Sequence, residues 1–519
     1  MNYSMLIVSL SLTSIASLES EKMSHTEMHS LELELQRRNP DNGRIVLTKE
    51  KFEPSKTGIV VVDMWNFHWC KTAATRVAAM VPRMNQALDV ARQLGIQIFL
   101  CPTDVADSYV GLPQRERAVA APRHPLPETI EIPSPQTRGG DCMCGPGIVC
   151  QGNHGWDAMP AELNIGENDL IAKGTEELYS LCKECGITDL LYMGLHTNMC
   201  LLGKPVGMMP MMRTGINCIL ARDLNDACTE YDPERGYTPD DGTAEVIEQI
   251  EQNLAPTINM VEEFKQAGLW PEDWIVDAVH ITPWGRPSFP HQFEDSVTVT
   301  FSTPRIEGAQ IRYTLDGSEP TENSLIYTEP FILKQTATVR AIAFEGNQKA
   351  SLESIGDFVR LPASPPMPEV FISELKPIRA IAARYQFQAK MNRSYGDTDL
   401  TIRGIKYEKG VGVHAPSQLL YELKPEYDRF VALAGVDETL IEDNHGRGAA
   451  RYPSVIFRVF IDGKLVAESP LMKILQEAWR FDVSLPAGSR NISLTVIDAD
   501  DSNRYDFANW INAGFVLRK

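Results

Sequence analysis

The period of the apolar and polar positions changes part-way along this chain of 519 residues. Between about residues 57 and 258, apolar runs at 58–65, 96–102, 187–194 and 216–223 alternate with stretches of helical spacing at 73–95 and 175–186. Near-continuous apolar strands separated by helices are typical of a parallel sheet covered on both faces. The pattern therefore predicts an α/β domain, which we place at residues 29–280.

Beyond residue 280 the pattern alternates from one residue to the next. The segments 297–303, 310–317 and 337–344 have this alternation, with turn signals between them. They predict a small antiparallel β-sandwich at residues 291–361. After the proline-rich stretch 364–368, short strands with Asp-Gly turns predict a second β-sandwich at residues 369–519. The expected fold class is thus a multidomain chain, one α/β domain followed by two all-β modules.

The net charge of -20 and a pI near 5.0 narrow the class of partner. Nucleic acids and anionic membranes attract basic surfaces, so we expect neither as a partner. A small-molecule substrate and neutral glycans fit better, and a homo-oligomer is left open. Because no segment has the roughly 20 consecutive apolar residues of a spanning helix, we expect no membrane span.

Residues 1–28 form a weak export signal. They contain an apolar stretch of signal-peptide length, but no Lys or Arg precedes it. We predict a signal peptide or disordered segment there and a secreted or periplasmic protein. The alternative is a cytoplasmic protein whose translation begins at Met23.

Two reactive residues follow apolar runs. Asp63 directly follows the apolar residues 58–62, and Cys200 lies in the sequence GLHTNMC, just after the run at 187–194. The carboxyl ends of parallel strands open into one crevice, so these residues can meet there. A cysteine hydrolase needs a thiolate, a base and donors to an oxyanion. At this point Asp63 could also merely cap the next helix, and Cys200 could be an inert core thiol.

The combination resembles the isochorismatase-like cysteine hydrolases. Their plan is a strand ending in Asp, a strand ending in Lys, and a strand followed by Gly-x-x-Thr-x-x-Cys. Asp63 matches the first part, and Gly194, Thr197 and Cys200 match the last. The resemblance implies a Rossmann-like sheet, a covalent thioester-type intermediate, and cleavage of an amide or other C–N bond without a cofactor.

The same resemblance implies further residues of the site. A cis peptide in the turn of His196 and Thr197 and an oxyanion hole built with the Cys200 amide are expected. Lys173, in NDLIAKG, is the expected catalytic cation, although it could be a solvated lysine at a helix start. In that case Arg115 or Arg117 would replace it.

Around Asp63 the chain departs from the commoner motif of this family. The expected pocket residues are Trp65, His68, Trp69 and Arg115, although His68 could be a packing residue. Asp223 and Asp226 are expected near the rim of the crevice. The segment 101–109 has no histidine for a nicotinamidase-type metal, so we predict no catalytic metal.

All ten cysteines lie between Cys70 and Cys228. Cys142, Cys144 and Cys150, with His154 nearby, do not have a standard two-pair zinc spacing. A loop disulfide, plain packing and a structural metal all remain open for this segment.

The two β modules have resemblances of their own. The sequence YTLDGSEPT at 313–321 is similar to the C-terminal module of chitobiase and related hexosaminidases. Residues 369–518 resemble the carbohydrate-binding module abbreviated NPCBM, through stretches such as GIKYEKGVGVHAPSQLLYEL and VIFRVFIDGK. This second resemblance implies a jelly-roll-like sandwich that binds glycans.

Polar and aromatic residues at strand ends of the last module are candidates for sugar contact. Acidic acceptors beside aromatic faces suit the hydroxyls and C–H faces of sugar rings. The candidates are His414, Asp437, Tyr505, Asp506 and Trp510. The alternative is that the aromatic residues belong to the core.

The expected function is a cysteine hydrolase that acts on an amide or other C–N bond, with C-terminal modules that hold it near polysaccharide. The alternative is a non-catalytic glycan-binding or adhesion protein on a degenerate hydrolase fold.

Overall fold

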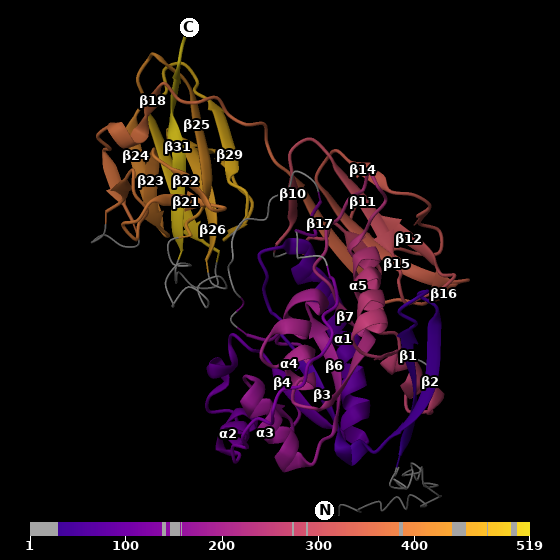
Figure 1. The fold of residues 1–519 in the computed structure, drawn as a ribbon. Coiled ribbons are helices and arrows are strands. Elements are labelled where there is room, and N and C mark those ends of the chain that lie inside the picture. Colours follow the sequence, from indigo (N-terminus) through magenta and orange to yellow (C-terminus); the bar gives the residue numbers. More distant parts are fainter. Residues whose placement is uncertain are drawn as a thin grey trace, which may run out of the picture.

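The structure is a computed structural model of the whole chain. It describes residues 30–137, 142–145, 156, 158–271, 274–286, 289–382, 388–438, 453–474, 476–499 and 506–519. The predicted signal segment, Cys150, His154 and Tyr505 lie outside the described residues. Figure 1 shows an α/β part in indigo and magenta, a β module beside it, and a second β module in orange and yellow. None of the described helices combines the length and apolar character needed to cross a bilayer.

The first sheet has eight strands in the order β2-β1-β8-β7-β6-β3-β4-β5. They are β1 (Leu31–Arg38), β2 (Ile45–Phe52), β3 (Thr57–Val62), β4 (Gln97–Cys101), β5 (Leu170–Ile171), β6 (Asp189–Leu195), β7 (Asn217–Asp226) and β8 (Thr257–Ile258). The pairs from β8 to β5 are parallel, as the apolar runs predict.

The expectation of a wholly parallel sheet is wrong at one edge. β1 and β2 form an antiparallel hairpin, and β1 pairs antiparallel with β8. In β1 the sequence LELELQRR buries Leu31, Leu33 and Leu35. This alternation buries one face only, which suits an antiparallel strand next to the edge strand β2. The sheet is therefore mixed.

Helices cover both faces of this sheet. Its helices are α1 (Lys71–Gln93), α2 (Pro113–Ala120), α3 (Thr175–Cys185), α4 (Met208–Met212), α5 (Pro239–Asn253) and α6 (Met260–Gln266), with short turns η1 (Pro54–Lys56) and η2 (Ala106–Tyr109). Ile59 and Val61 of β3 join a core with α1 and α6. Val60 and Val62 join a second core with α3, α4 and α5. Successive side chains of a strand point to opposite faces, so one apolar run contributes side chains to both cores.

The middle module has two sheets around one core. One has the order β10-β17-β15-β12-β13, with β16 on β15, and the other β14-β11-β9. The strands are β9 (His280–Thr282), β10 (His291–Phe293), β11 (Val297–Ser302), β12 (Gln310–Thr314), β13 (Leu325–Ile326), β14 (Phe331–Leu333), β15 (Ala337–Glu345), β16 (Gln348–Lys349) and β17 (Ser354–Arg360). β9 pairs with β11, so this module includes a strand ahead of residue 291.

The last module has two large sheets, in the orders β20-β23-β31-β25-β29 and β19-β24-β30-β26-β27, with β18 on β31 and β28 on β26, and a two-stranded sheet of β21 and β22. Its elements up to β24 are β18 (Val370–Phe371), η4 (Ile372–Glu374), β19 (Arg379–Ile381), β20 (Lys390–Met391), β21 (Leu400–Ile402), β22 (Ile405–Tyr407), β23 (Gly410–His414) and β24 (Ser417–Glu422). The others are β25 (Tyr427–Val436), β26 (Ser454–Ile461), β27 (Lys464–Glu468), β28 (Met472–Lys473), β29 (Trp479–Ser484), β30 (Asn491–Asp498) and β31 (Phe507–Leu517). Both large sheets contribute to one core.

Candidate active site

Asp63 follows the last residue of β3 and is fully buried. The backbone amide and hydroxyl of Thr103 donate to its Oδ1 at 2.9 and 2.8 Å. Lys204 Nζ lies 2.9 Å from its Oδ2. Burial raises the pKa of Asp63, while the charge of Lys204 and the hydrogen bonds from Thr103 act in the opposite direction. A buried carboxylate held in this way can accept a proton from a neighbour.

Gly194 lets β6 approach β3 at this point. It pairs with Val62 across the two strands and has a φ of 114°. A Cβ at Gly194 would lie 2.1 Å from the carbonyl oxygen of Val62. Only glycine tolerates both this φ and this contact. The glycine therefore brings the strand that leads to Cys200 against the strand that leads to Asp63.

Cys200 lies in the π-helical turn η3 (Thr197–Leu201), directly after β6. The amides of Met199 and Leu201 both donate to the carbonyl of His196, at 3.0 and 3.1 Å. The Cys200 amide lies between these donors and takes no part in either bond. π-Helical turns are frequent at functional sites.

The thiol of Cys200 is half-buried beside Asp63. Burial, together with the charge of Asp63 and a side-chain hydrogen bond with it, raises the pKa of Cys200 to about 12. The Lys204 charge and a hydrogen bond with the His196 backbone oppose this rise. The thiol of Cys200 is therefore protonated at neutral pH.

Lys204 is a site residue that the sequence analysis missed. Its ammonium contacts Asp63, the Thr103 hydroxyl at 2.8 Å and Asp104 at 2.6 Å. Burial works against the charge of Lys204, yet the negative charge of Asp63, together with that of Cys200 when the thiol is ionised, raises the pKa of Lys204. Its backbone amide donates to the Cys200 carbonyl at 3.1 Å, so one helical turn separates the two residues. That spacing is the signal that could have found it.

The cations expected from the sequence have other partners. Lys173 Nζ pairs with Asp107 at 2.5 Å, and its side chain is 45% exposed. Arg115 is buried against Glu177. Arg117 donates to backbone carbonyls of residues 167 and 169. The structure thus brings Lys204, and not Lys173, to Asp63. β5, which precedes Lys173, pairs with β4 and not with β3, the strand that leads to Asp63.

An aromatic group lies beside the turn. Trp65 stacks on His68 with ring centroids 4.5 Å apart and meets His196 edge-on at 4.6 Å. Trp69 lies 4.8 Å from His68. Four of the six residues expected in the turn and pocket thus gather in one place, whereas Arg115 does not join them.

His196 is buried and uncharged. Burial lowers the pKa of His196 to about 4. Its Nε2 has no hydrogen-bond partner among the described residues. The expected cis peptide in this turn is not found, because the cis bonds of the described chain are Thr282–Pro283 and Ala415–Pro416. Thr197 is held by its hydroxyl, which donates to Asn225 at 2.6 Å.

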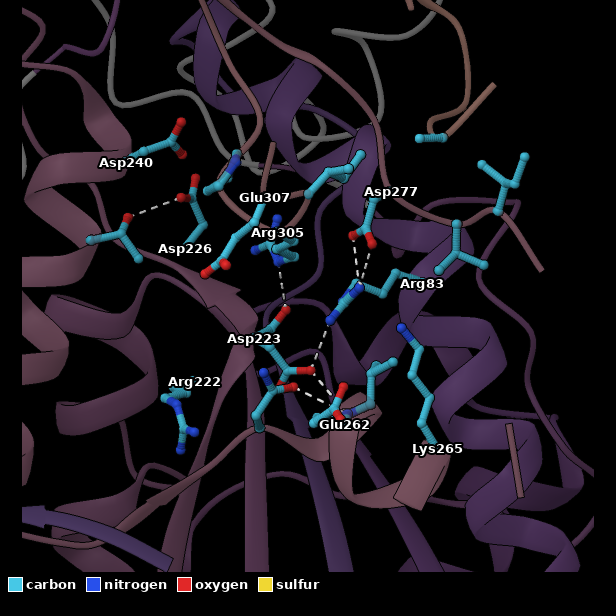
Figure 2. A pocket seen from close by; sticks show the side chains of 18 of the residues that line it. Arg83, Arg222, Asp223, Asp226, Asp240, Glu262, Lys265, Asp277, Arg305 and Glu307 are labelled. Atoms are coloured by element: carbon cyan, nitrogen blue, oxygen red, sulfur yellow. Dashed lines mark hydrogen bonds and ion pairs between the residues drawn. The ribbon is translucent and has the colours of Figure 1, made fainter. Parts of the chain in front are cut away.

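Asp223 and Asp226 lie at a seam with the middle module rather than free at a rim. Asp226 accepts two bonds from Arg76, at 2.8 and 2.5 Å. Asp223 pairs with Arg83 at 3.0 Å, and Arg305 donates to its backbone carbonyl. Asp223, Asp226, Arg83 and Arg305 line a pocket of about 810 Å³, and Figure 2 shows how their side chains lie in it. Both carboxylates thus pair with arginines of α1 inside the α/β domain, and the backbone carbonyl of Asp223 accepts a bond from Arg305 of the middle module.

Most of the expected sugar-contact residues of the last module are buried. Trp510 is 0% exposed and packs edge-on against Phe457, which corrects its expected role in stacking on a sugar. Asp437 accepts from Asn509 and from the Thr401 amide.

The other two described candidates differ in exposure. Asp506 is fully buried and accepts from the Ser454 amide at 3.2 Å. His414 is half-buried between Tyr395 and Phe507, with centroids 5.2 Å from each. His414 is therefore the described candidate that could still reach a ligand.

Two stretches match known domain families. Residues 368–516 match the NPCBM/NEW2 domain. Residues 290–354 match the chitobiase/beta-hexosaminidase C-terminal domain. Both resemblances expected from the motifs are confirmed, and the chain carries a module of a carbohydrate-binding family.

Relatives and solved structures resemble parts of the chain. Alpha-1,3-galactosidase B of Akkermansia muciniphila is 30% identical over 129 residues, which are 24% of this chain and 15% of that protein. A CBM51 module from Clostridium perfringens, solved with methyl-galactose, is 27% identical with a TM-score of 0.25, over 28% of this chain and 99% of that one. A cysteine hydrolase from Pseudomonas syringae is 16% identical with a TM-score of 0.28, and the match covers 45% of this chain and 98% of that one. The chain thus spans only a small part of the curated relative.

Proposed function

We propose that the α/β domain is a cysteine hydrolase of the isochorismatase-like type that cleaves an amide or other C–N bond. The observation that carries this proposal is the ion pair of Lys204 and Asp63, 2.9 Å apart, next to the thiol of Cys200. A nucleophile, a proton acceptor and a cation that the protein holds together are the parts that this chemistry needs.

Asp63 would receive the thiol proton as the Cys200 sulfur forms a bond to the carbonyl carbon. The carbonyl electron pair moves to oxygen, where the Cys200 amide and the Lys204 charge stabilise it. The C–N bond then breaks, and Asp63 gives its proton to the leaving amine. The thioester remains.

Water completes the cycle. Asp63 takes a proton from water, whose oxygen attacks the thioester carbon. The C–S bond breaks, and the thiol regains its proton from Asp63. The net reaction is amide plus water to acid plus amine. Lys204 keeps the carboxylate ionised between the two half-reactions by its charge.

We propose that the last module holds the enzyme near a neutral glycan in an extracellular or periplasmic setting. The match of residues 368–516 to the NPCBM/NEW2 domain supports a glycan ligand. The net charge of -20 supports a neutral one.

Ammonia release from a panel of small primary amides, free or attached to neutral sugars, tests the hydrolase. Cys200→Ala should lose turnover by at least about 1,000-fold. Cys185→Ser, at the end of α3, is the matched cysteine control and should keep it. Undiminished turnover in the Cys200 variant would exclude this thiol as the nucleophile.

The substitution Asp63→Asn tests whether Asp63 acts as the base or only holds the structure of the site. Turnover should be lost because no group takes the thiol proton. Alkylation of Cys200 by iodoacetamide should not slow, since the negative charge that raises its pKa is gone. Equal losses of turnover and alkylation would indicate that the variant had only disturbed the site.

The second candidate is the non-catalytic glycan-binding protein. The domain match of residues 368–516 favours it independently of the thiol site. Glycan capture by the full chain, with no turnover of any amide in the panel by the unmodified protein, is the result expected from this alternative.

A further inference from the structure

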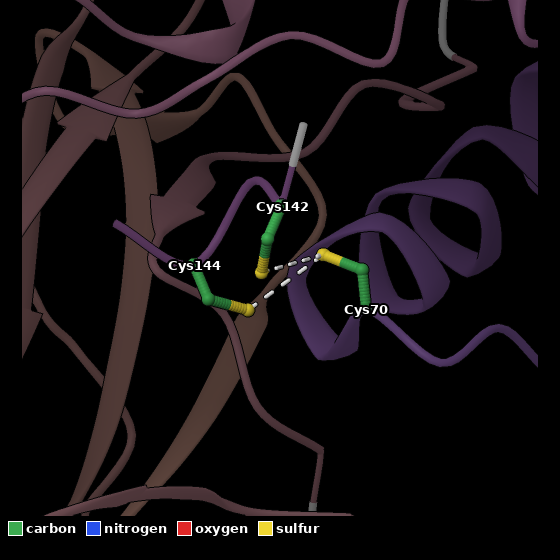
Figure 3. A group of neighbouring side chains, drawn as sticks. All are labelled: Cys70, Cys142 and Cys144. Carbon is green, nitrogen blue, oxygen red and sulfur yellow. Dashed lines mark hydrogen bonds between the residues drawn. The ribbon is translucent and has the colours of Figure 1, made fainter. Parts of the chain in front are cut away.

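Three thiols outside the proposed active site converge on one point. Cys70 is the N-cap residue of α1, whereas Cys142 and Cys144 come from a segment more than 70 residues later. The Cys70 sulfur lies 3.7 Å from that of Cys144 and 3.9 Å from that of Cys142, and all three lie within 4.8 Å of one another (Figure 3). We call these residues the three-thiol cluster.

The spacing of the cluster fits a metal. A Zn–S bond of about 2.3 Å places the sulfurs of a tetrahedral site roughly 3.8 Å apart and those of a trigonal site roughly 4.0 Å apart. The two distances from the Cys70 sulfur, 3.7 and 3.9 Å, agree with such a site.

The surroundings of the cluster favour thiolates. Cys70 lies at the start of a 23-residue helix, where the positive end of the dipole favours a negative sulfur. The Met143 amide donates to the Cys70 sulfur at 3.4 Å. The Thr72 hydroxyl lies 3.3 Å from the Cys144 sulfur and accepts from the Trp284 amide, so its own hydrogen can be donated to the sulfur. Such donors are the outer-shell partners that orient metal-bound thiolates.

We propose that the three-thiol cluster binds a thiophilic d¹⁰ ion, Zn²⁺ or Cu⁺. Thiolates select these ions over the oxygen-preferring Mg²⁺ and Ca²⁺. Metal–sulfur bonds replace up to three S–H bonds, and the protons pass to solvent. The ion would fasten residues 142–145 to the start of α1, directly after the segment that carries Asp63 and Trp65. Its role is structural, and it does not depend on the proposed hydrolysis.

Metal content of the full chain tests this proposal. The reduced protein is loaded with Zn²⁺ alone or with Cu⁺ alone, desalted and analysed by plasma mass spectrometry. About one ion per chain should remain in the unmodified protein. Cys142→Ser and Cys144→Ser should each retain at least about ten-fold less. Cys185→Ser, a cysteine outside the cluster, should retain as much as the unmodified protein.

Two further measurements keep the test decisive. Loading with Co²⁺ should give a thiolate-to-metal charge-transfer band that Cys144→Ser removes, and circular dichroism shows whether each variant is folded. Competition between a zinc chelator and a Cu⁺ chelator distinguishes the two ions. Equal metal content in all folded variants would overturn the proposal. So would the loss of two titratable thiols from this cluster, without bound metal, in protein purified without reductant, because that result indicates a disulfide.

Discussion

The α/β domain and the last β module both have acidic residues at strand ends, yet the groups that these residues contact differ. Asp63 faces a lysine and a thiol, whereas Asp437 and Asp506 hold amides of their own module. In a parallel sheet every strand ends at the same edge, so the residues that follow β3 and β6 converge. Neighbouring antiparallel strands end at opposite edges, and a buried carboxylate there serves the nearest backbone donors. An acidic residue at a strand end is thus better evidence for chemistry in a parallel sheet.

The largest effect expected from this comparison concerns two lysines. Lys204→Met should lower kcat/KM by about 100-fold or more, because the developing charge and the buried Asp63 lose their cation. Lys173→Met, which removes an exposed ion pair with Asp107, should stay within about two-fold. Steady-state kinetics on the best amide of the panel measures both. Equal losses would mean that position in the sheet does not select the catalytic cation.

The substitution Gly194→Ala tests, through the stability of the fold, whether β3 and β6 must approach closely. The added Cβ meets the Val62 carbonyl and the φ is unfavourable, so we expect a loss of about 2–3 kcal/mol in the free energy of unfolding. Gly203→Ala, where a Cβ would have no neighbour within 4 Å, is the control. Denaturant unfolding gives both values, and similar values would show that β3 and β6 need no such close approach.

Asp437→Ala tests the structural role in the last module. The substitution leaves the Thr401 amide and the Asn509 side chain without the carboxylate that accepts from them. The free energy of unfolding should therefore fall by about 1–3 kcal/mol. The control Asp399→Ala, at an exposed position, should lower the free energy of unfolding by less than about 0.5 kcal/mol. Thermal unfolding measures the difference. A variant of Asp437 that is fully stable but binds no glycan would reverse the comparison and return Asp437 to the ligand site.

The smallest effect is a shift in pH dependence. Thr103→Val removes the hydroxyl that donates to the Asp63 carboxylate, so the pKa of Asp63 should rise further. Because the base must be ionised, activity falls as the pH falls through this pKa, and the acidic limb of the kcat/KM profile should move to higher pH. A limb that stays in place would indicate that another group titrates there.

The sequence predicted much of the α/β domain from its apolar runs. The segments that became β3, β4, β6 and β7, and the helical spacing of α1 and α3, follow from local side-chain period. The hairpin of β1 and β2 was missed because its place at the sheet edge depends on pairing with β8, far along the chain.

What the sequence by itself determined is the presence of a thiol and a carboxylate after two buried strands, and the identity of the two β modules by their motifs. Tertiary structure decided which lysine meets Asp63, because the loop after β4 supplies Thr103 and Asp104 as partners that hold the Lys204 ammonium. It also decided that Trp510 is core and that Cys70 meets two cysteines from a distant segment. The physical reason is the range of the interactions. Strand and helix period is set by neighbours in sequence, whereas a charge or a sulfur finds its partner only after the sheets have packed.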